Sequence, residues 1–79
     1  MNKNNYFAIQ AVENDRNYSY VMKIHSCENV KSKLSDDRIK FVHLCNTKKQ
    51  AEELSRFWNQ CFIDNGTSYF DKVYPVYVA

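Results

Sequence analysis

Two His-x-Cys pairs are the sharpest chemical pattern in this sequence. They are His25-Ser26-Cys27 and His43-Leu44-Cys45, and residues two apart on a β-strand share a face of the sheet. Two histidines and two cysteines can bind zinc tetrahedrally. A hairpin that turns near residue 33 would pair His25 with Phe41, which offsets the two pairs by about four residues, roughly 13 Å along the strands. We therefore expect no bound metal and no cofactor. His25, Cys27, His43 and Cys45 are the residues that would bind a metal ion if the two pairs came together.

Other catalytic parts are missing from the sequence. Cys61 falls on the apolar stripe of the helix described below, where a thiol behaves as a small hydrophobic side chain. Neither histidine has a serine or a carboxylate at a spacing typical of a catalytic triad. Gly66 is the only glycine, and we expect it to end that helix, so a glycine-rich phosphate loop cannot form. The sequence thus favours a protein that is not an enzyme.

Basic residues are concentrated in the middle of the chain. Residues 28–49 carry six Lys or Arg against three acidic residues, residues 50–79 carry two against four, and the whole chain has a net charge of +2. Such lysines usually keep a small sheet soluble and block edge pairing. The alternative is a phosphate-binding surface on which Tyr18, Tyr20 and Phe41 stack on bases. The candidate partner-binding residues are Lys23, Lys31, Lys33, Arg38, Lys40, Phe41 and, as a large apolar residue on the polar side of the helix, Ile63.

One long helix organises the predicted fold. We expect it over residues 46–66, where a capping box of Thr47 and Gln50 marks the start and Gly66 supplies the left-handed residue that commonly ends a helix. At about 100° per residue, its apolar stripe comprises Ala51, Leu54, Trp58, Cys61 and Phe62, with Phe57 on the flank. The rest of the chain must cover this stripe.

Three β-rich runs precede the helix and one follows it. Residues 6–13 and 18–27 flank a cluster of turn formers and predict a hairpin, and a third strand is expected over residues 38–45. Residues 73–78 predict a last strand, which Pro75 restricts to a sheet edge or a bulge. The prediction is a single α+β domain over residues 1–79, a two-layer sandwich of a small antiparallel sheet with one helix across one face, in the order β-β-β-α-β.

Alternation along the strands predicts which residues face the helix. The expected set is Phe7, Ile9 and Ala11 on the first strand and Tyr20, Met22 and Ile24 on the second. The opposite face would then carry Tyr6, Ala8, Val21 and Phe41 beside Lys23 and His25, which is more apolar than a solvent-facing surface. Because a domain of this size buries only about 60% of its unfolded surface, we expect a homodimer that packs through this face at Phe41.

Composition places the protein in the cytoplasm. No apolar run approaches the roughly 18 residues of a membrane span, and the first five residues do not form an apolar signal segment. Three cysteines without C-x-x-C spacing fit reduced thiols better than a disulfide framework. We expect no contact with a membrane.

Several short segments carry a resemblance. They are Tyr6–Ala11, Leu44–Glu53, Trp58-Asn59 and Asn65-Gly66-Thr67. They resemble small uncharacterised proteins of phages and mobile genetic elements of Firmicute bacteria, which share a T-K-K-x-A-E-E helix start followed by W-N and N-G-T. The resemblance transfers no site residue, but it implies a context in which small proteins bind and block a host or rival machine, including RNA-guided defence nucleases. We therefore expect a non-enzymatic, anti-CRISPR-type inhibitor that engages a host defence nuclease or its nucleic acid. The alternative is a small nucleic-acid-binding accessory protein that uses a basic, aromatic sheet face.

Overall fold

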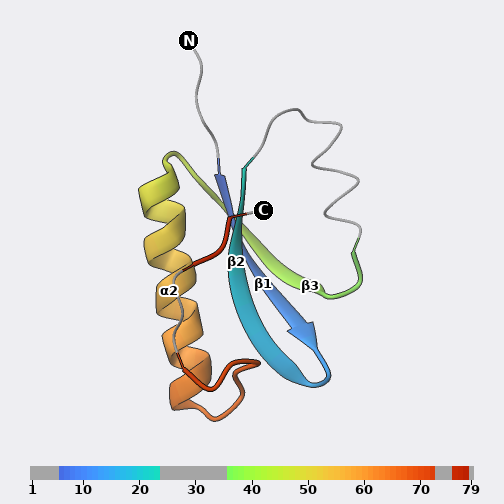
Figure 1. Cartoon of the computed structure of the whole chain (residues 1–79). Coiled ribbons are helices and arrows are strands. Elements are labelled where there is room, and N and C mark those ends of the chain that lie inside the picture. Colours follow the sequence, from blue (N-terminus) through green and yellow to red (C-terminus); the bar gives the residue numbers. More distant parts are fainter. Residues whose placement is uncertain (1–5, 24–35, 73–75, 79) are drawn as a thin grey trace.

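The structure is a computed structural model of the chain, and it describes residues 6–23, 36–72 and 76–78. These residues form an antiparallel three-stranded sheet and a long helix, in the order β1 (Tyr6–Glu13), β2 (Arg16–Lys23), β3 (Ile39–Cys45) and α2 (Lys48–Asp64). The helix lies beside the sheet (Figure 1) and contacts all three strands. The α+β class is confirmed. Within the described ranges, no helix is long and apolar enough to cross a membrane.

The first two strands form the predicted hairpin. Its turn consists of Asn14 and Asp15, whose φ angles are 54° and 62°, and Glu13 pairs with Arg16 across it. Two successive left-handed residues match the right-handed twist of the flanking strands, and Asn and Asp tolerate this conformation best among residues with a side chain. The local turn chemistry therefore fixes the register of β1 and β2, with β2 starting at Arg16 instead of Tyr18.

The helix has the two predicted caps. At its start the Gln50 backbone N–H donates to Thr47 Oγ1 (3.1 Å), while the Asn46 N–H donates to Gln50 Oε1 (3.2 Å), one position before the cap that the capping box predicts. At its end Gly66 has a φ of 73°, and the N–H groups of Gly66 and Thr67 donate to the carbonyls of Ile63 and Phe62. This is the Schellman arrangement, so α2 is bounded by local signals at both ends.

The face of the sheet that packs against the helix is the opposite of the one expected from the sequence. The core under α2 is a cluster of Tyr6, Ala8, Val21, Cys45 and Ala51, with Leu54, Trp58, Val76 and Val78 packed against it. The expectation that Phe7, Ile9, Ala11, Tyr20 and Met22 face the helix is therefore wrong. The prediction that Tyr6, Ala8 and Val21 form an uncovered surface is wrong as well. A homodimer therefore cannot pack through these three residues.

Side-chain size explains the orientation. Ala8, Ala51 and Ser55 are each 0% exposed, and small side chains at these positions allow the helix and the sheet to approach closely. The bulkier residues of β1 and β2 then occupy the other face, where Ile9 is also 0% exposed and Met22 is 3% exposed. Both faces of the sheet centre are thus shielded from water.

After the helix, the described parts of the chain bond to β2 at two places. Ser68 and Val78 form isolated parallel bridges with Asn17 and Val21, and Figure 1 shows this segment in orange and red next to β2. The described residues 76–78 do not form a strand of their own, so the predicted strand over 73–78 is not confirmed. Pro75 and Ile24 lie outside the described residues.

Candidate functional site

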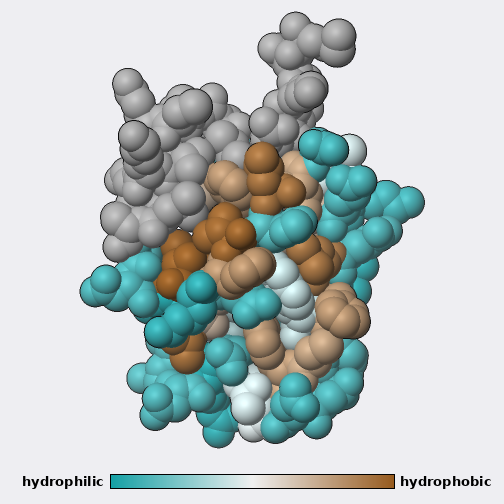
Figure 2. Space-filling view, turned by 180° about the vertical axis from the view of Figure 1, so that it is seen from behind, coloured by the Kyte–Doolittle hydropathy of each residue, from teal (hydrophilic) through white to brown (hydrophobic). Residues whose placement is uncertain are grey.

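Large apolar side chains are exposed on β3 and α2. Phe41, Leu44 and Phe57 are 52%, 53% and 62% exposed, and β3 is an edge strand in the order β2-β1-β3. The ring of Phe41 packs edge-on against Trp58 of the helix, with the ring centroids 5.7 Å apart. We call Phe41, Leu44, Phe57 and Trp58 the β3–α2 patch, in which Phe41 lies on the helix side of the β3 edge and Leu44 on the opposite side. Seen from behind the view of Figure 1, apolar side chains gather in a band bordered by hydrophilic ones (Figure 2).

The predicted partner-binding residues are spread over the molecule. Lys31 and Lys33 lie outside the described residues. Lys40 is exposed on β3, beside the β3–α2 patch, whereas Lys23 is half-buried at the end of β2. Ile63 lies at a pocket on the β2 side of the helix. Among the described candidates, therefore, Lys40 and Phe41 lie close together and the others do not join them.

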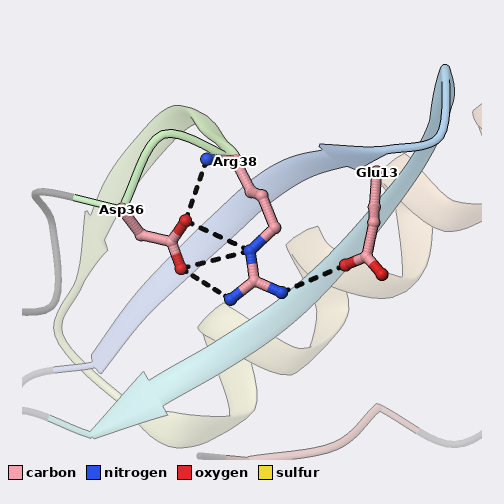
Figure 3. A network of polar contacts seen from close by, with 3 residues as sticks. All are labelled: Glu13, Asp36 and Arg38. Atoms are coloured by element: carbon pink, nitrogen blue, oxygen red, sulfur yellow. Dashed lines mark hydrogen bonds and ion pairs between the residues drawn. The ribbon is translucent and has the colours of Figure 1, made fainter.

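The charge of Arg38 is compensated by two carboxylates (Figure 3). Its Nη2 donates to Asp36 Oδ2 at 2.7 Å, its Nη1 donates to Glu13 Oε1 at 3.1 Å, and its Nε donates to Asp36 Oδ1 at 3.1 Å. The Arg38 carbonyl also accepts a hydrogen bond from the Val12 N–H at 2.8 Å. These bonds tie the start of β3 to the end of β1, so Arg38 has a structural role here and not that of a free phosphate ligand.

The Arg38 contacts predict a measurable shift in acid titration. Hydrogen bonds from the Arg38 side chain and from its backbone N–H lower the pKa of Asp36 from 3.8 to about 2. A lowered carboxyl pKa stabilises the fold above pH 3.8, and this contribution is lost as the pH falls toward 2. We expect Arg38→Gln to raise the pKa of Asp36 toward its ordinary value in an NMR titration of the carboxyl carbons. Arg16→Gln is the control, because Arg16 donates to the Ser68 carbonyl. An unchanged Asp36 pKa in Arg38→Gln would contradict this account.

The metal candidates are only partly described. His25 and Cys27 lie outside the described residues, and His43 is exposed on β3. Cys45 is buried, its Sγ lies 3.9 Å from the His43 carbonyl as a weak donor, and burial raises the pKa of its thiol. A raised pKa disfavours the thiolate that binds zinc. Within residues 6–23, 36–72 and 76–78, no three His, Cys, Asp or Glu side chains are grouped to hold a metal ion.

A buried polar network joins α2 to β2. The side-chain amide of Asn59 accepts a hydrogen bond from the Ser19 N–H (2.8 Å) and donates one to the Ser19 carbonyl (3.0 Å). Ser55 Oγ donates to Ser19 Oγ at 2.7 Å. The amide of Asn59 thus takes the place that a peptide group of a neighbouring strand would have at the outer edge of β2. All three residues are buried, and the polar atoms satisfy one another.

An aromatic pocket lies at this same edge, and the sequence pattern did not predict it. It has a volume of about 270 Å³, and its walls include Tyr18, Tyr20, Phe70 and Tyr77. Burial raises the pKa of Tyr18 and of Tyr20, so both hydroxyls are neutral near pH 7. The available signal was the Tyr18-x-Tyr20 pair, which places two rings on one face of a strand. No local pattern indicates that Phe70 and Tyr77 join them.

The chain matches no protein-family model, no curated protein and no solved structure. These comparisons therefore assign neither a family nor an activity. The resemblance to proteins of phages and mobile elements stays a hypothesis.

Proposed function

We propose that this chain is a non-enzymatic binding protein that engages a protein partner through the β3–α2 patch. The observation that carries the proposal is the exposure of Phe41, Leu44 and Phe57, each more than half accessible to water. Exposed apolar patches on monomers commonly mark interaction sites, and aromatic residues are enriched at the energetic centres of protein interfaces. Fully burying one such side chain contributes about 1.5–3 kcal/mol.

The position of the patch on an edge strand supports a specific geometry. An extended segment of a partner can pair with the main chain of an edge strand, while pockets on either side receive its side chains. Phe41 pairs with Gln10 and Leu44 pairs with Phe7 in the register with β1, so these two side chains project on opposite faces of β3. They would flank an added strand from both sides, and Lys40 would lie at the rim.

The resemblance supplies the kind of partner. We take it to be host defence machinery, in the first instance an RNA-guided nuclease, as for an anti-CRISPR-type inhibitor. The alternative is a nucleic-acid-binding accessory protein, which the stacked rings of Tyr18 and Tyr20 favour, with centroids 6.0 Å apart. The compensated charge of Arg38 weakens this alternative. The two functions differ in their response to salt, because counterion release makes nucleic-acid affinity fall steeply as salt rises.

The test compares variants in the cleavage of target DNA by a panel of purified RNA-guided nucleases. We expect the wild-type protein to inhibit one of them, and Phe41→Asp to weaken this inhibition by roughly tenfold or more, because a carboxylate at the contact would have to be desolvated. Lys49→Gln is the matched control, since it lowers the net charge by the same amount on an exposed part of α2. Circular dichroism confirms that each variant is folded.

Three outcomes would overturn parts of the proposal. If no nuclease of the panel is inhibited, the choice of partner is wrong. If Phe41→Asp inhibits as well as Lys49→Gln does, the patch is wrong. If labelled DNA or RNA alone binds tightly, with an affinity that collapses between two salt concentrations, the nucleic-acid alternative replaces the first function.

A homodimer through Phe41, as expected from the sequence, would use the same patch and would compete with the partner for it. Face packing through Tyr6, Ala8 and Val21 is excluded because they are buried under α2, but Phe41 is accessible on the β3 edge. Light scattering during size exclusion measures the mass directly. A mass of 9.4 kDa at high micromolar concentration would refute the dimer, and a dimer that persists in Phe41→Asp would place the contact elsewhere.

A further inference from the structure

The pocket at the outer edge of β2 has no room for an added peptide strand. At its two ends the backbone N–H groups of Asn17 and Val21 donate to carbonyls of residues that follow α2, at 2.8 and 3.0 Å. Between them the side-chain amide of Asn59 is bonded to both the N–H and the carbonyl of Ser19. A strand that pairs with β2 would need these same backbone groups. The pocket therefore suits a compact molecule and not an extended peptide.

The walls of the pocket are mainly aromatic and aliphatic. They include Tyr18, Tyr20, Ile63, Phe70, Val76 and Tyr77. The ring of Tyr20 lies nearly parallel to that of Tyr18, at 24°, and to that of Tyr77, at 20°, with centroids 6.0 and 5.7 Å apart. Tyr77 is 64% exposed, so the ring at this end of the stack keeps surface that a ligand can cover. A planar ring extends a stack of near-parallel rings with the largest contact.

The walls offer no unpaired charge to a ligand. The described lining residues include no aspartate, glutamate, arginine or histidine, and the charged residue among them, Lys72, already has an interaction partner of its own. All buried polar side-chain atoms of the described residues have hydrogen-bond partners, so none of them requires a polar group from the ligand. A charged ligand would lose its water here without gaining a counterion, which is costly. The pocket therefore favours an uncharged molecule.

The arrangement of the rings also disfavours a cation. An aromatic cage binds a quaternary ammonium group when several ring faces surround the charge. In this pocket the rings of Tyr18, Tyr20 and Tyr77 are near-parallel, so their faces lie toward one another and not toward a common centre. Such a stack contacts a flat ring better than a spherical cation.

The volume limits the ligand to a small molecule. The pocket measures about 270 Å³, which exceeds the cavity of about 150 Å³ that holds a benzene molecule and falls just below the range of roughly 300–1,000 Å³ typical of drug-sized ligands. We propose that this pocket binds a small, uncharged, planar aromatic molecule of one or two rings, which stacks against Tyr77 and packs against Ile63 and Val76.

The charge of the ligand is tested with three probes on one ring system, titrated into the whole chain and followed by NMR. They are indole-3-carboxamide, which is uncharged, the anion indole-3-carboxylate and the cation indole-3-carboxamidinium. We expect the carboxamide to shift the backbone amides of Ser19, Ser68 and Tyr77 and to bind several-fold more tightly than either charged probe, because only the charged groups have to be desolvated without a counterion.

The planarity of the ligand is tested with benzamide and cyclohexanecarboxamide, which share a polar group and differ in the ring. Benzamide should bind several-fold more tightly, since only its flat ring can stack. Tyr77→Leu keeps an apolar side chain but removes the stacking ring, and it should weaken indole-3-carboxamide by roughly two- to tenfold. Phe57→Leu is the matched control, because it removes a ring of similar exposure, 62% against 64%, from the β3–α2 patch.

The probe comparisons use the wild-type chain and do not depend on the folding of any variant. Absence of shifts at Ser19, Ser68 and Tyr77 with every probe at millimolar concentration would refute the site. A charged probe that binds as tightly as the carboxamide would refute the preference for an uncharged ligand, and equal affinity for benzamide and cyclohexanecarboxamide would refute stacking. Equal effects of Tyr77→Leu and Phe57→Leu would refute the contact with Tyr77. None of these results bears on the binding of a protein partner at β3, so the two proposals fail independently.

Discussion

Replacement of Asn59 by leucine is expected to remove a large part of the folding stability. Leucine has a similar size, but it leaves the Ser19 N–H and carbonyl without the partners that lie at 2.8 and 3.0 Å. Each buried polar group left unsatisfied costs about 1–3 kcal/mol, so the loss should be about 2–6 kcal/mol. A chain of 79 residues has a total stability on the order of 4–12 kcal/mol. Urea denaturation followed by circular dichroism measures the change.

The control for this prediction is Gln60→Leu, one residue along the same helix. Gln60 is exposed and donates to Asp64 on the helix surface, so its replacement should change the stability by no more than about 0.5 kcal/mol. Hydrogen exchange adds a local readout, because the Ser19 amide should lose its protection in Asn59→Leu. If both leucine variants unfold at the same urea concentration as the wild type, the amide of Asn59 is not the bond that closes the edge of β2.

Truncation of Ile9 to alanine is expected to cost about 2–5 kcal/mol, the value for deleting a large aliphatic side chain from a packed core. Ile9 is 0% exposed, although its side chain projects away from the helix. Its neighbours in β1, Ala8 and Gln10, project toward the helix. Thermal unfolding and urea denaturation both report this loss.

Leu44→Ala is the matched control, because Leu44 pairs with Phe7 and so projects on the same face as Ile9, yet it is 53% exposed. Its truncation should cost less than about 1 kcal/mol. Equal and small losses in the two variants would mean that the sheet face away from α2 is not packed. Equal and large losses would mean that Leu44 is buried in solution, which would also weaken the case for the β3–α2 patch.

The elements that could be predicted are those specified by adjacent residues. The cap of α2 depends on Thr47 and Gln50, and its end depends on Gly66, all within a few residues of the bonds that they make. The turn at Asn14 and Asp15 is likewise a local conformational preference. These signals require no knowledge of the tertiary structure, and the structure contains each of them.

The side of the sheet that packs on the helix could not be predicted, because alternation separates two sets of residues without ranking them. Ser19, Ser55 and Asn59 are polar, and each becomes a favourable core residue only once the others are in place. The aromatic pocket depends on contacts such as Tyr20 with Tyr77, which are far apart in the chain. Hydrophobic periodicity carries no signal for such pairs.

The occupied edge of β2 limits how copies of this chain can associate. With Asn17, Ser19 and Val21 already bonded along that edge, the sheet formed by the described residues can add a strand only at β3. Such a molecule resembles a monomer with a single reactive end. Two copies that pair through their β3 edges leave no free strand edge in the described sheet to which a third copy could add. Edge-to-edge association therefore terminates at a closed pair instead of propagating into a fibre.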